Sequence, residues 1–232
     1  MSVIYHLGKG LGKFCFNVFG RVEVTGRENV PRYGPLIIVA NHLSFTDPPV
    51  MVCSLPRSLD FLGKGELFAN PASSFLMRNF HVHPFDRLGL GVDAVRMAMR
   101  LLAQDRALVV FPEGRRSPDH RLGDGLPGAA YMALRSQAPV LPVGITGTEK
   151  ISAWRMPVPL TRFRVNIGQP FSLPVVEGTP TRGVVVNMQE MIMSRIAALL
   201  PPEYQGDWAT PPPRQRKDAG NRVPQADASL QR

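Results

Sequence analysis

The hydrophobic run at residues 35–40 constrains the fold of this chain more than any other feature. From Leu36 to Ala40 every residue is apolar, so neither face of a β-strand here is polar. Strands of this kind are typical of parallel sheets that are covered by helices on both faces. Residues 107–111 and 140–145 are two further apolar runs, and all three predict buried strands. Residues 162–167 alternate between polar and apolar, which predicts a strand with only one covered face.

Helical patterns lie between these strands. In residues 92–104, for example, Val92, Val95, Met99 and Leu102 recur on one helical face. Further helices are expected at residues 47–53, 66–79, 128–136 and 184–200, and shorter strands at residues 22–24, 59–63 and 81–85. Strands that alternate with helices indicate an α/β layered fold. We therefore expect a mixed, largely parallel central sheet flanked by helices, in one domain that spans residues 21–204.

The two ends of the chain differ from this domain. In residues 3–20 apolar side chains recur at helical spacing, with Lys9 and Lys13 on the opposite side. This amphipathic helix either packs on the core of the domain or lies in a membrane interface with its apolar side down. Residues 205–232 are polar and proline-rich, which predicts a flexible tail.

The overall charge narrows the class of partner. The formal net charge is +9 and the sequence pI is about 10.2. This surplus favours an anionic partner, which could be nucleic acid, a membrane surface, or a phosphorylated or CoA-type substrate.

No apolar run approaches the roughly 20 residues of a transmembrane helix, and the first residues lack the pattern of a signal peptide. Cys15 and Cys53 lie far apart without ligand spacing, so we expect buried thiols and no metal site.

A histidine and an aspartate follow the first buried run, in the stretch Asn41-His42-Leu43-Ser44-Phe45-Thr46-Asp47. A neutral imidazole can take a proton from a hydroxyl near neutral pH, and a carboxylate on its other ring nitrogen fixes the tautomer. His42 and Asp47 form such a pair only if the chain bends between them, and a strand end followed by a helix start supplies that bend. In the structural alternative, Asp47 is only the N-cap of a helix that has Pro48 at its first position. The spacing alone favours this structural alternative.

The nucleophile of a base-assisted reaction would come from the substrate. No G-x-S-x-G stretch occurs in the chain, which disfavours a covalent serine hydrolase. If His42 is a base, it therefore activates a hydroxyl that belongs to the substrate.

A second polar stretch, residues 111–117, follows the buried run at 107–111. Open α/β sheets bind ligands at such strand ends. Gly114 allows close approach of the backbone, and Arg115 and Arg116 offer donors that fit phosphate or carboxylate. Arg87 likewise follows a strand candidate. Each arginine could instead be a solvated surface charge, and Glu113 could pair with one of them.

Taken together, these stretches resemble the 1-acyl-glycerol-3-phosphate acyltransferases, the lysophosphatidic acid acyltransferase family of phospholipid synthesis. The resemblance covers about residues 20 to 170. Four stretches match in order: Asn41-His42 with Asp47; Phe85-Asp86-Arg87; Phe111-Pro112-Glu113-Gly114 with Arg116 and Ser117; and Val140-Leu141-Pro142-Val143. The first and third stretches together are specific to this family.

The resemblance implies a role for each residue. His42 would be the general base on the acceptor hydroxyl, and Asp47 would orient it. The hydroxyl would attack the thioester of acyl-CoA or acyl-carrier protein, without an acyl-enzyme intermediate. The reaction would need no cofactor, and its product would be phosphatidic acid. The residues implied to hold the acceptor's glycerol phosphate are Arg87, Glu113, Gly114 and Arg116, with Arg115 as a further candidate. The residues implied to line the cleft are Leu141, Pro142 and Val143.

The resemblance also bears on the partners and the location. It implies a lysophospholipid acceptor, an acyl thioester donor and a membrane surface, and no nucleic acid. Residues 1–20 would then be a membrane-contacting helix, and the protein would be peripheral or monotopic at the cytoplasmic face of the cell membrane.

Two departures from the family pattern leave the acceptor open. Arg115 stands where the family usually has Thr, and Leu126 stands where it often has Lys. A different lysolipid or alcohol acceptor is therefore an alternative. From other functional classes, the alternatives are a non-catalytic protein that binds anionic lipid or nucleic acid, and a thioesterase in which His42 activates water.

Overall fold

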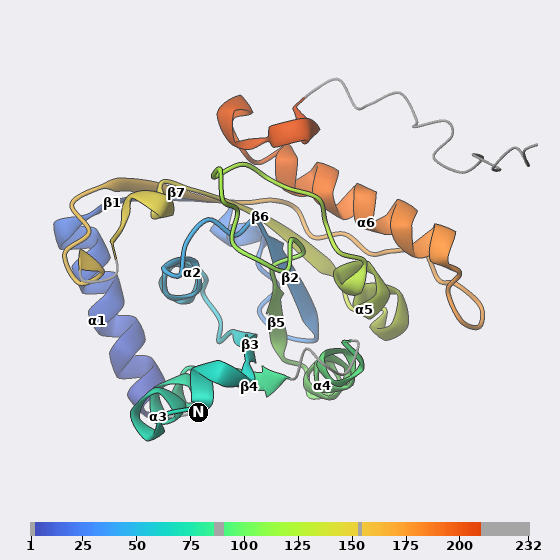
Figure 1. Ribbon diagram of the computed structural model, residues 1–232, viewed down its shortest axis with the longest axis horizontal. Helices are drawn as coiled ribbons and strands as arrows, with labels where there is room; N and C mark the ends of the chain where they lie inside the picture. Colours follow the sequence, from blue (N-terminus) through green and yellow to red (C-terminus); the bar gives the residue numbers. More distant parts are fainter. Residues whose placement is uncertain (1–2, 86–90, 153–154, 210–232) are drawn as a thin grey trace, which may run out of the picture.

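A seven-stranded sheet forms the centre of the computed structural model, which describes residues 3–85, 91–152 and 155–209 (Figure 1). The strands lie in the order β1-β7-β6-β2-β5-β3-β4. Their bounds are Arg21–Thr25 (β1), Leu36–Ala40 (β2), Asp60–Lys64 (β3), Val82–Phe85 (β4), Ala107–Val110 (β5), Val140–Thr146 (β6) and Arg162–Ile167 (β7). Neighbouring strands are parallel except for the antiparallel pair β6 and β7. The prediction of a mixed, largely parallel sheet is confirmed.

Helices cover both faces of this sheet. Their bounds are Val3–Phe19 (α1), Asp47–Ser54 (α2), Pro71–Asn79 (α3), Val92–Leu102 (α4), Gly128–Ser136 (α5) and Arg182–Ala197 (α6). Side chains of α1 and α2 share one buried cluster with the sheet, and side chains of α4, α5 and α6 share the other. Figure 1 shows these two groups of helices on opposite sides of the central strands.

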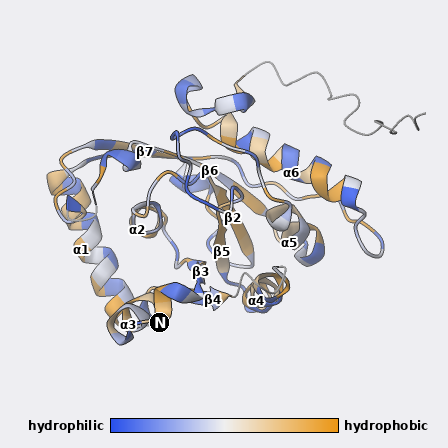
Figure 2. Cartoon of the chain, in the orientation of Figure 1, coloured by the Kyte–Doolittle hydropathy of each residue, from blue (hydrophilic) through white to orange (hydrophobic). Residues whose placement is uncertain are grey.

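The two clusters explain why the run in β2 is continuously hydrophobic. Leu36, Ile38 and Ala40 belong to the cluster with α1 and α2, whereas Ile37 and Val39 belong to the cluster with α4, α5 and α6. All five side chains are fully buried. Because successive side chains of a strand point to opposite faces, both faces of β2 must be apolar. The hydropathy colouring in Figure 2 shows the same for the central strands.

The direction of the strands brings three loops together. β5, β2 and β6 are neighbours and run parallel, so their carboxyl ends meet at one edge of the sheet. The chain leaves this edge after Ala40, Val110 and Thr146. Ligands of open α/β sheets bind at such an edge.

An ion cluster around the buried Asp60 carboxylate lies at the amino ends of β3 and β5, and we call it the Asp60 cluster. Arg106 donates two hydrogen bonds of 2.7 Å to the Asp60 carboxylate, and His83 Nε2 lies 2.7 Å from Asp60 Oδ1. Burial alone would raise the pKa of Asp60, but the hydrogen bonds from His83 and Arg106 outweigh it and hold the pKa below its ordinary value. The cluster ties β4 and the start of β5 to β3.

Two segments differ from their predicted boundaries. Residues 66–79 do not form one helix, because a 3₁₀ turn at Gly65–Phe68 precedes α3. Asn70 caps α3 by accepting a 3.0 Å hydrogen bond from the Ser73 N–H, and Pro71 stands at the first helical position.

The expected tail begins with folded residues: Gly206–Trp208 form a 3₁₀ turn, and Gln205 donates hydrogen bonds to two carbonyls of the preceding segment. Residues 210–232 lie outside the described part of the chain.

The predicted N-terminal amphipathic helix is present as α1. It packs on the domain through Tyr5 and Phe16, which are its buried residues. The apolar side chains of its other side are largely exposed: Val3, Leu7, Leu11, Phe14 and Val18. Among the described helices, none combines the length and the apolar character that a membrane crossing needs.

Candidate active site

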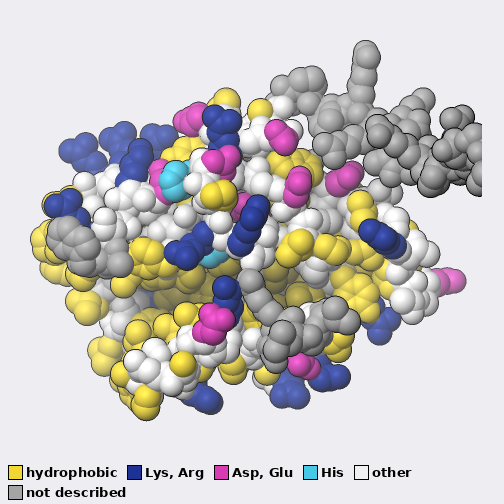
Figure 3. Space-filling view, in the orientation of Figure 1, with side chains coloured by type: hydrophobic (Ala, Val, Ile, Leu, Met, Phe, Trp, Pro, Cys, Tyr) yellow, Lys and Arg dark blue, Asp and Glu magenta, His cyan; other side chains and the backbone are white. Residues whose placement is uncertain are grey.

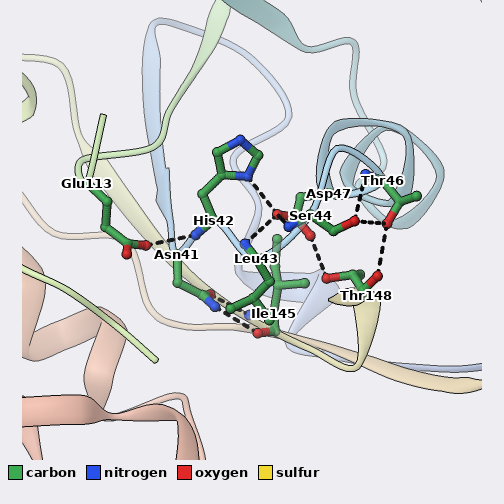
Figure 4. Close-up of polar contacts among 9 residues, drawn as sticks. All are labelled: Asn41, His42, Leu43, Ser44, Thr46, Asp47, Glu113, Ile145 and Thr148. Atoms are coloured by element: carbon green, nitrogen blue, oxygen red, sulfur yellow. Dashed lines mark hydrogen bonds and ion pairs between the residues drawn. The ribbon is translucent and has the colours of Figure 1, made fainter. Parts of the chain in front are cut away.

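His42 and Asp47 meet where β2 ends. His42 Nδ1 lies 2.7 Å from Asp47 Oδ2 (Figure 4). The Asp47 side chain is fully buried, whereas the His42 side chain is 18% exposed. A carboxylate on Nδ1 holds the imidazole proton at that nitrogen and leaves a lone pair on Nε2. Figure 4 shows the second ring nitrogen directed away from Asp47, so it is placed to act on another molecule.

Asp47 makes contacts that an N-cap residue does not make. Its Oδ2 accepts hydrogen bonds from the Leu43 and Ser44 N–H groups at 2.7 and 2.8 Å, and its Oδ1 accepts one from Thr148 Oγ1 at 2.5 Å. The N–H groups precede α2, which begins at Asp47, and Thr46 takes the cap position without a side-chain capping bond. The prediction that Asp47 caps the helix is therefore wrong. Its carboxylate instead stabilises the bend that returns the chain to His42.

Asn41 fixes the chain immediately before His42. Its side chain forms two 2.8 Å hydrogen bonds with the backbone of Ile145, one to the carbonyl and one from the N–H. The side chain thus continues the pairing of β2 with β6 beyond the last residue of the strand. Because Asn41 is fully buried, this contact holds the start of the loop rigidly.

Glu113 fixes the backbone of His42 from the other side. Glu113 Oε1 accepts the His42 N–H at 2.9 Å, and Oε2 accepts the Gly123 N–H at 3.1 Å. Burial raises the pKa of Glu113, and these two N–H groups oppose that rise by stabilising the carboxylate. Both oxygens therefore accept hydrogen bonds from the protein's own backbone, and a role of Glu113 in holding the acceptor stays a prediction.

The His42 ring itself is held by Phe111. The two rings stack with centroids 4.1 Å apart and planes 18° apart. The Ser117 N–H donates to the His42 carbonyl at 2.8 Å. The imidazole thus has one stacked face, one ring nitrogen on a carboxylate, and a backbone anchored at both its N–H and its carbonyl.

The comparison with known sequences concerns the segment that contains this pair. Residues 21–146 match the sequence model of the family described as Acyltransferase. This chain belongs to the acyltransferase family.

Individual relatives agree with this assignment. The chain is 35% identical over 136 residues to the chloroplastic 1-acyl-sn-glycerol-3-phosphate acyltransferase BAT2 of Brassica napus, covering 57% of this chain and 39% of that one. It is 25% identical over 198 residues to the 1-acyl-sn-glycerol-3-phosphate acyltransferase of Bacillus subtilis, covering 81% and 96%. A crystal structure of the LPA acyltransferase PlsC from Thermotoga maritima matches with a TM-score of 0.66 and 28% identity, covering 82% and 76%. The chain therefore spans about two fifths of the plant relative and nearly all of the Bacillus one.

The predicted phosphate-contacting residues of this acyltransferase-family chain have different surroundings. Arg115 and Arg116 are exposed, next to the loop that carries Glu113. Gly114 has φ +67°, so a side chain here meets backbone strain, and the exposed Leu126 side chain would have to move aside for an added Cβ. Arg87 lies outside the described residues.

The predicted cleft-lining residues lie inside the sheet. Leu141, Pro142 and Val143 belong to β6, whose residues are all buried. Pro142 and Val143 pair with Val39 and Ala40 of β2. In this structure these residues are buried and support β2, the strand that leads to His42.

No local sequence pattern predicts the contact of Thr148 with Asp47 or the stacking of Phe111 on His42. Thr148 is separated from Asp47 by 101 positions, so no local spacing pattern can link them. The available signal was that Thr148 follows the end of a buried strand parallel to β2.

In the described part of the chain, no group of three or more His, Cys, Asp or Glu side chains is arranged to hold a metal ion.

Proposed function

We propose that this protein transfers a fatty acyl group from acyl-CoA or acyl-carrier protein to the free hydroxyl of 1-acyl-glycerol-3-phosphate, which gives phosphatidic acid. The observation that carries the proposal is the 2.7 Å contact between His42 Nδ1 and Asp47 Oδ2, at the carboxyl edge of an acyltransferase-family fold. The names of the relatives from Brassica napus, Bacillus subtilis and Thermotoga maritima support the choice of acceptor.

In the proposed step, His42 Nε2 takes the proton of the acceptor hydroxyl while the hydroxyl oxygen attacks the thioester carbonyl carbon. A C–O bond forms, the C–S bond breaks, and the proton passes from His42 to the departing thiolate. The products are an ester and a free thiol, and no cofactor beyond the donor substrate is required. Asp47 stabilises the imidazolium that forms between the two proton transfers. Its other hydrogen bonds keep the carboxylate in place throughout.

The acceptor phosphate is proposed to contact the basic side chains beside the pair. Arg115 and Arg116 are exposed, and neither forms a hydrogen bond or ion pair with another described residue. Guanidinium groups at such a strand end suit a phosphate monoester. The resemblance adds Arg87 to this set. Leu126 is 58% exposed where a lysine is usual, so a lysolipid other than lysophosphatidic acid is the alternative acceptor.

Contact with a membrane surface is a further part of the proposal. The exposed apolar side of α1 carries Val3, Leu7, Leu11, Phe14 and Val18, each more than half exposed. Figure 3 shows hydrophobic side chains gathered over α1 and α3 on this side of the molecule. Burial of the exposed part of each such side chain in lipid would contribute on the order of 1–2 kcal/mol, and a net charge of +9 adds attraction to anionic lipid. We place the protein as peripheral or monotopic at the cytoplasmic face of the cell membrane.

The catalytic proposal is tested by thiol release. Purified protein is given acyl-CoA and lysophosphatidic acid, and free CoA is followed with and without the acceptor. His42→Ala is expected to lower kcat by at least about a hundredfold, since general base catalysis contributes on that order. The matched control is His120→Asn, which changes an exposed histidine in the loop after the arginine pair.

The outcomes separate the candidate functions. A His42→Ala variant with the full rate would show that the assigned base is wrong. Thiol release that ignores the acceptor favours a thioesterase, and no turnover with any lysolipid favours a protein that only binds anionic lipid. A panel of lysolipids crossed with acyl-CoA and acyl-carrier protein identifies the acceptor and the donor.

The membrane proposal is tested by cosedimentation with vesicles that contain phosphatidylglycerol. Leu11→Asp and Phe14→Asp are expected to reduce the bound fraction, because each places a charge in the apolar side of α1. Val175→Asp is the matched control, since Val175 is 79% exposed in a loop of another region. Binding of all three variants at the wild-type level would exclude α1 as the contact.

A further inference from the structure

Residues 201–209, which we call the C-terminal strap, contact both loops that hold His42 and Asp47. The strap follows α6 and lies outside the family match, which ends at residue 146. It contains two 3₁₀ turns, Pro202–Tyr204 and Gly206–Trp208. Figure 1 shows it beside the loop between β5 and α5, although about 80 positions separate the two segments.

The first contact leads to the backbone of His42. The Tyr204 carbonyl accepts the Leu122 N–H at 2.8 Å, and Trp208 Nε1 donates to the Gly123 carbonyl at 3.2 Å. The Gly123 N–H in turn donates to Glu113, whose other oxygen accepts the His42 N–H. Movement of the strap would therefore move the carboxylate that anchors His42.

Close approach makes this contact specific. Gly206 has φ +57°, and an added Cβ would lie 2.5 Å from the Leu122 carbonyl oxygen. Leu122 is 2% exposed and belongs to the cluster against which Tyr204 and Trp208 pack. The loop around Gly123 is thus held between the strap and Glu113.

The second contact leads to Asp47. The Tyr204 hydroxyl donates to Glu149 Oε1 at 2.8 Å. Thr148, the residue immediately before Glu149, donates to Asp47 Oδ1. Glu149 Oε2 is buried and has no hydrogen-bond partner among the described residues. Burial raises the pKa of Tyr204 to about 12, and the Glu149 carboxylate adds to the rise, so the hydroxyl remains a donor at neutral pH.

We propose that Tyr204 and Trp208 are positioning residues for the His42–Asp47 pair. A single strap fixes the loop that anchors the His42 backbone and the loop that anchors the Asp47 carboxylate, and so keeps Nδ1 on Oδ2. Neither side chain touches the reacting atoms. The expected effect of the strap on the reaction rate rests on the proposed function. The expected effect on the position of the His42 imidazole does not.

The test removes the polar groups of the strap: Tyr204→Phe keeps the ring, and Trp208→Phe keeps an aromatic side chain of smaller volume. Tyr204→Phe deletes the hydroxyl, Trp208→Phe deletes the Nε1–H, and Tyr33→Phe, at a side chain 87% exposed, is the matched control. Two properties of the full chain are measured: the kinetic constants with acyl-CoA and lysophosphatidic acid, and the imidazole Nδ1–H resonance of His42 in protein labelled with ¹⁵N-histidine. The resonance is assigned with His42→Ala.

In both strap variants kcat is expected to fall about tenfold with both KM values nearly unchanged, because misplacement of the base affects the chemical step and not binding. The Nδ1–H resonance of His42 is expected to weaken as its proton exchanges faster with water. Glu149→Gln keeps an acceptor for the Tyr204 hydroxyl and is expected to retain kcat close to the wild-type value. Tyr33→Phe is expected to change neither property.

Unchanged kcat and an unchanged His42 resonance in both strap variants would overturn the inference. So would a lower melting temperature with kcat and the resonance intact, since that result assigns the strap to packing alone. If Tyr204→Phe does not fold, Trp208→Phe carries the test through the other loop. If the wild-type protein shows no turnover but the His42 resonance is weaker in the strap variants than in wild type, the strap inference is supported and the proposed reaction is rejected.

Discussion

Replacement of Asp47 by asparagine removes a charge and leaves the hydrogen-bonding pattern nearly intact. The amide oxygen can take the place of Oδ2, which accepts from His42 Nδ1 and from the Leu43 and Ser44 N–H groups. The amide nitrogen can take the place of Oδ1 and donate to Thr148 Oγ1, because a hydroxyl also accepts. The bend after β2 is therefore expected to persist in Asp47→Asn, and the main loss is the negative charge beside the imidazole.

The size of that loss follows from the geometry. The carboxylate and a developing imidazolium have their charges about 4 Å apart, which at an effective dielectric constant near 20 corresponds to roughly 4 kcal/mol. Solvent screens this pair little, since the Asp47 side chain is fully buried and that of His42 is 18% exposed. At about 1.4 kcal/mol per decade, kcat is expected to fall about a thousandfold, which lies within the range for general base catalysis.

The assay is thiol release from acyl-CoA at saturating lysophosphatidic acid, with urea unfolding measured in parallel. Asp93→Asn is the matched control, because Asp93 is a half-exposed carboxylate that pairs with Arg96 on the surface of α4. Folded Asp47→Asn protein with kcat within about threefold of wild type would refute the reasoning, since the charge would then contribute little to the barrier. A large fall in unfolding free energy would instead refute the expected preservation of the bend.

Three further perturbations probe the loop beside the site and the stability of the sheet. Gly114→Ala is expected to lower the free energy of unfolding by about 1–3 kcal/mol, measured in urea, because φ is +67°; an unchanged midpoint would contradict this. Glu113→Gln is expected to lower both the urea midpoint and kcat, because its amide nitrogen must face one of the two backbone N–H groups that the carboxylate now accepts. In the Asp60 cluster the folded pKa lies below the ordinary 3.8, so the stabilisation is complete above that value and is lost as the pH falls through the folded pKa. Asp60→Asn should flatten the acid limb of the stability–pH curve, and an unaltered limb would exclude this contribution.

Much of the fold could be predicted because its signals are local. The buried run of β2 and the alternation in β7 follow from which faces of each strand are covered. The helix boundary at Pro71 was missed, because a hydrophobic pattern that continues across 66–79 does not reveal the cap that Asn70 provides. The strap was missed for a related reason, since polar, proline-rich composition resembles a solvated end even where a few residues pack.

The features of the candidate site likewise separate into those that local sequence predicts and those that only the folded chain creates. By itself the sequence determined that His42 and Asp47 lie on either side of a bend after a buried strand, because strand end and helix start are both encoded within a few residues. Only the tertiary structure decided how Asp47 uses its oxygens: the bend brings the Leu43 and Ser44 N–H groups to Oδ2, and the first N–H after the two prolines, that of Val50, donates to the Thr46 carbonyl. It also brought Thr148 to Asp47 and Tyr204 to Glu149, because residues far apart in the chain meet only once the parallel strands place their carboxyl ends at one edge.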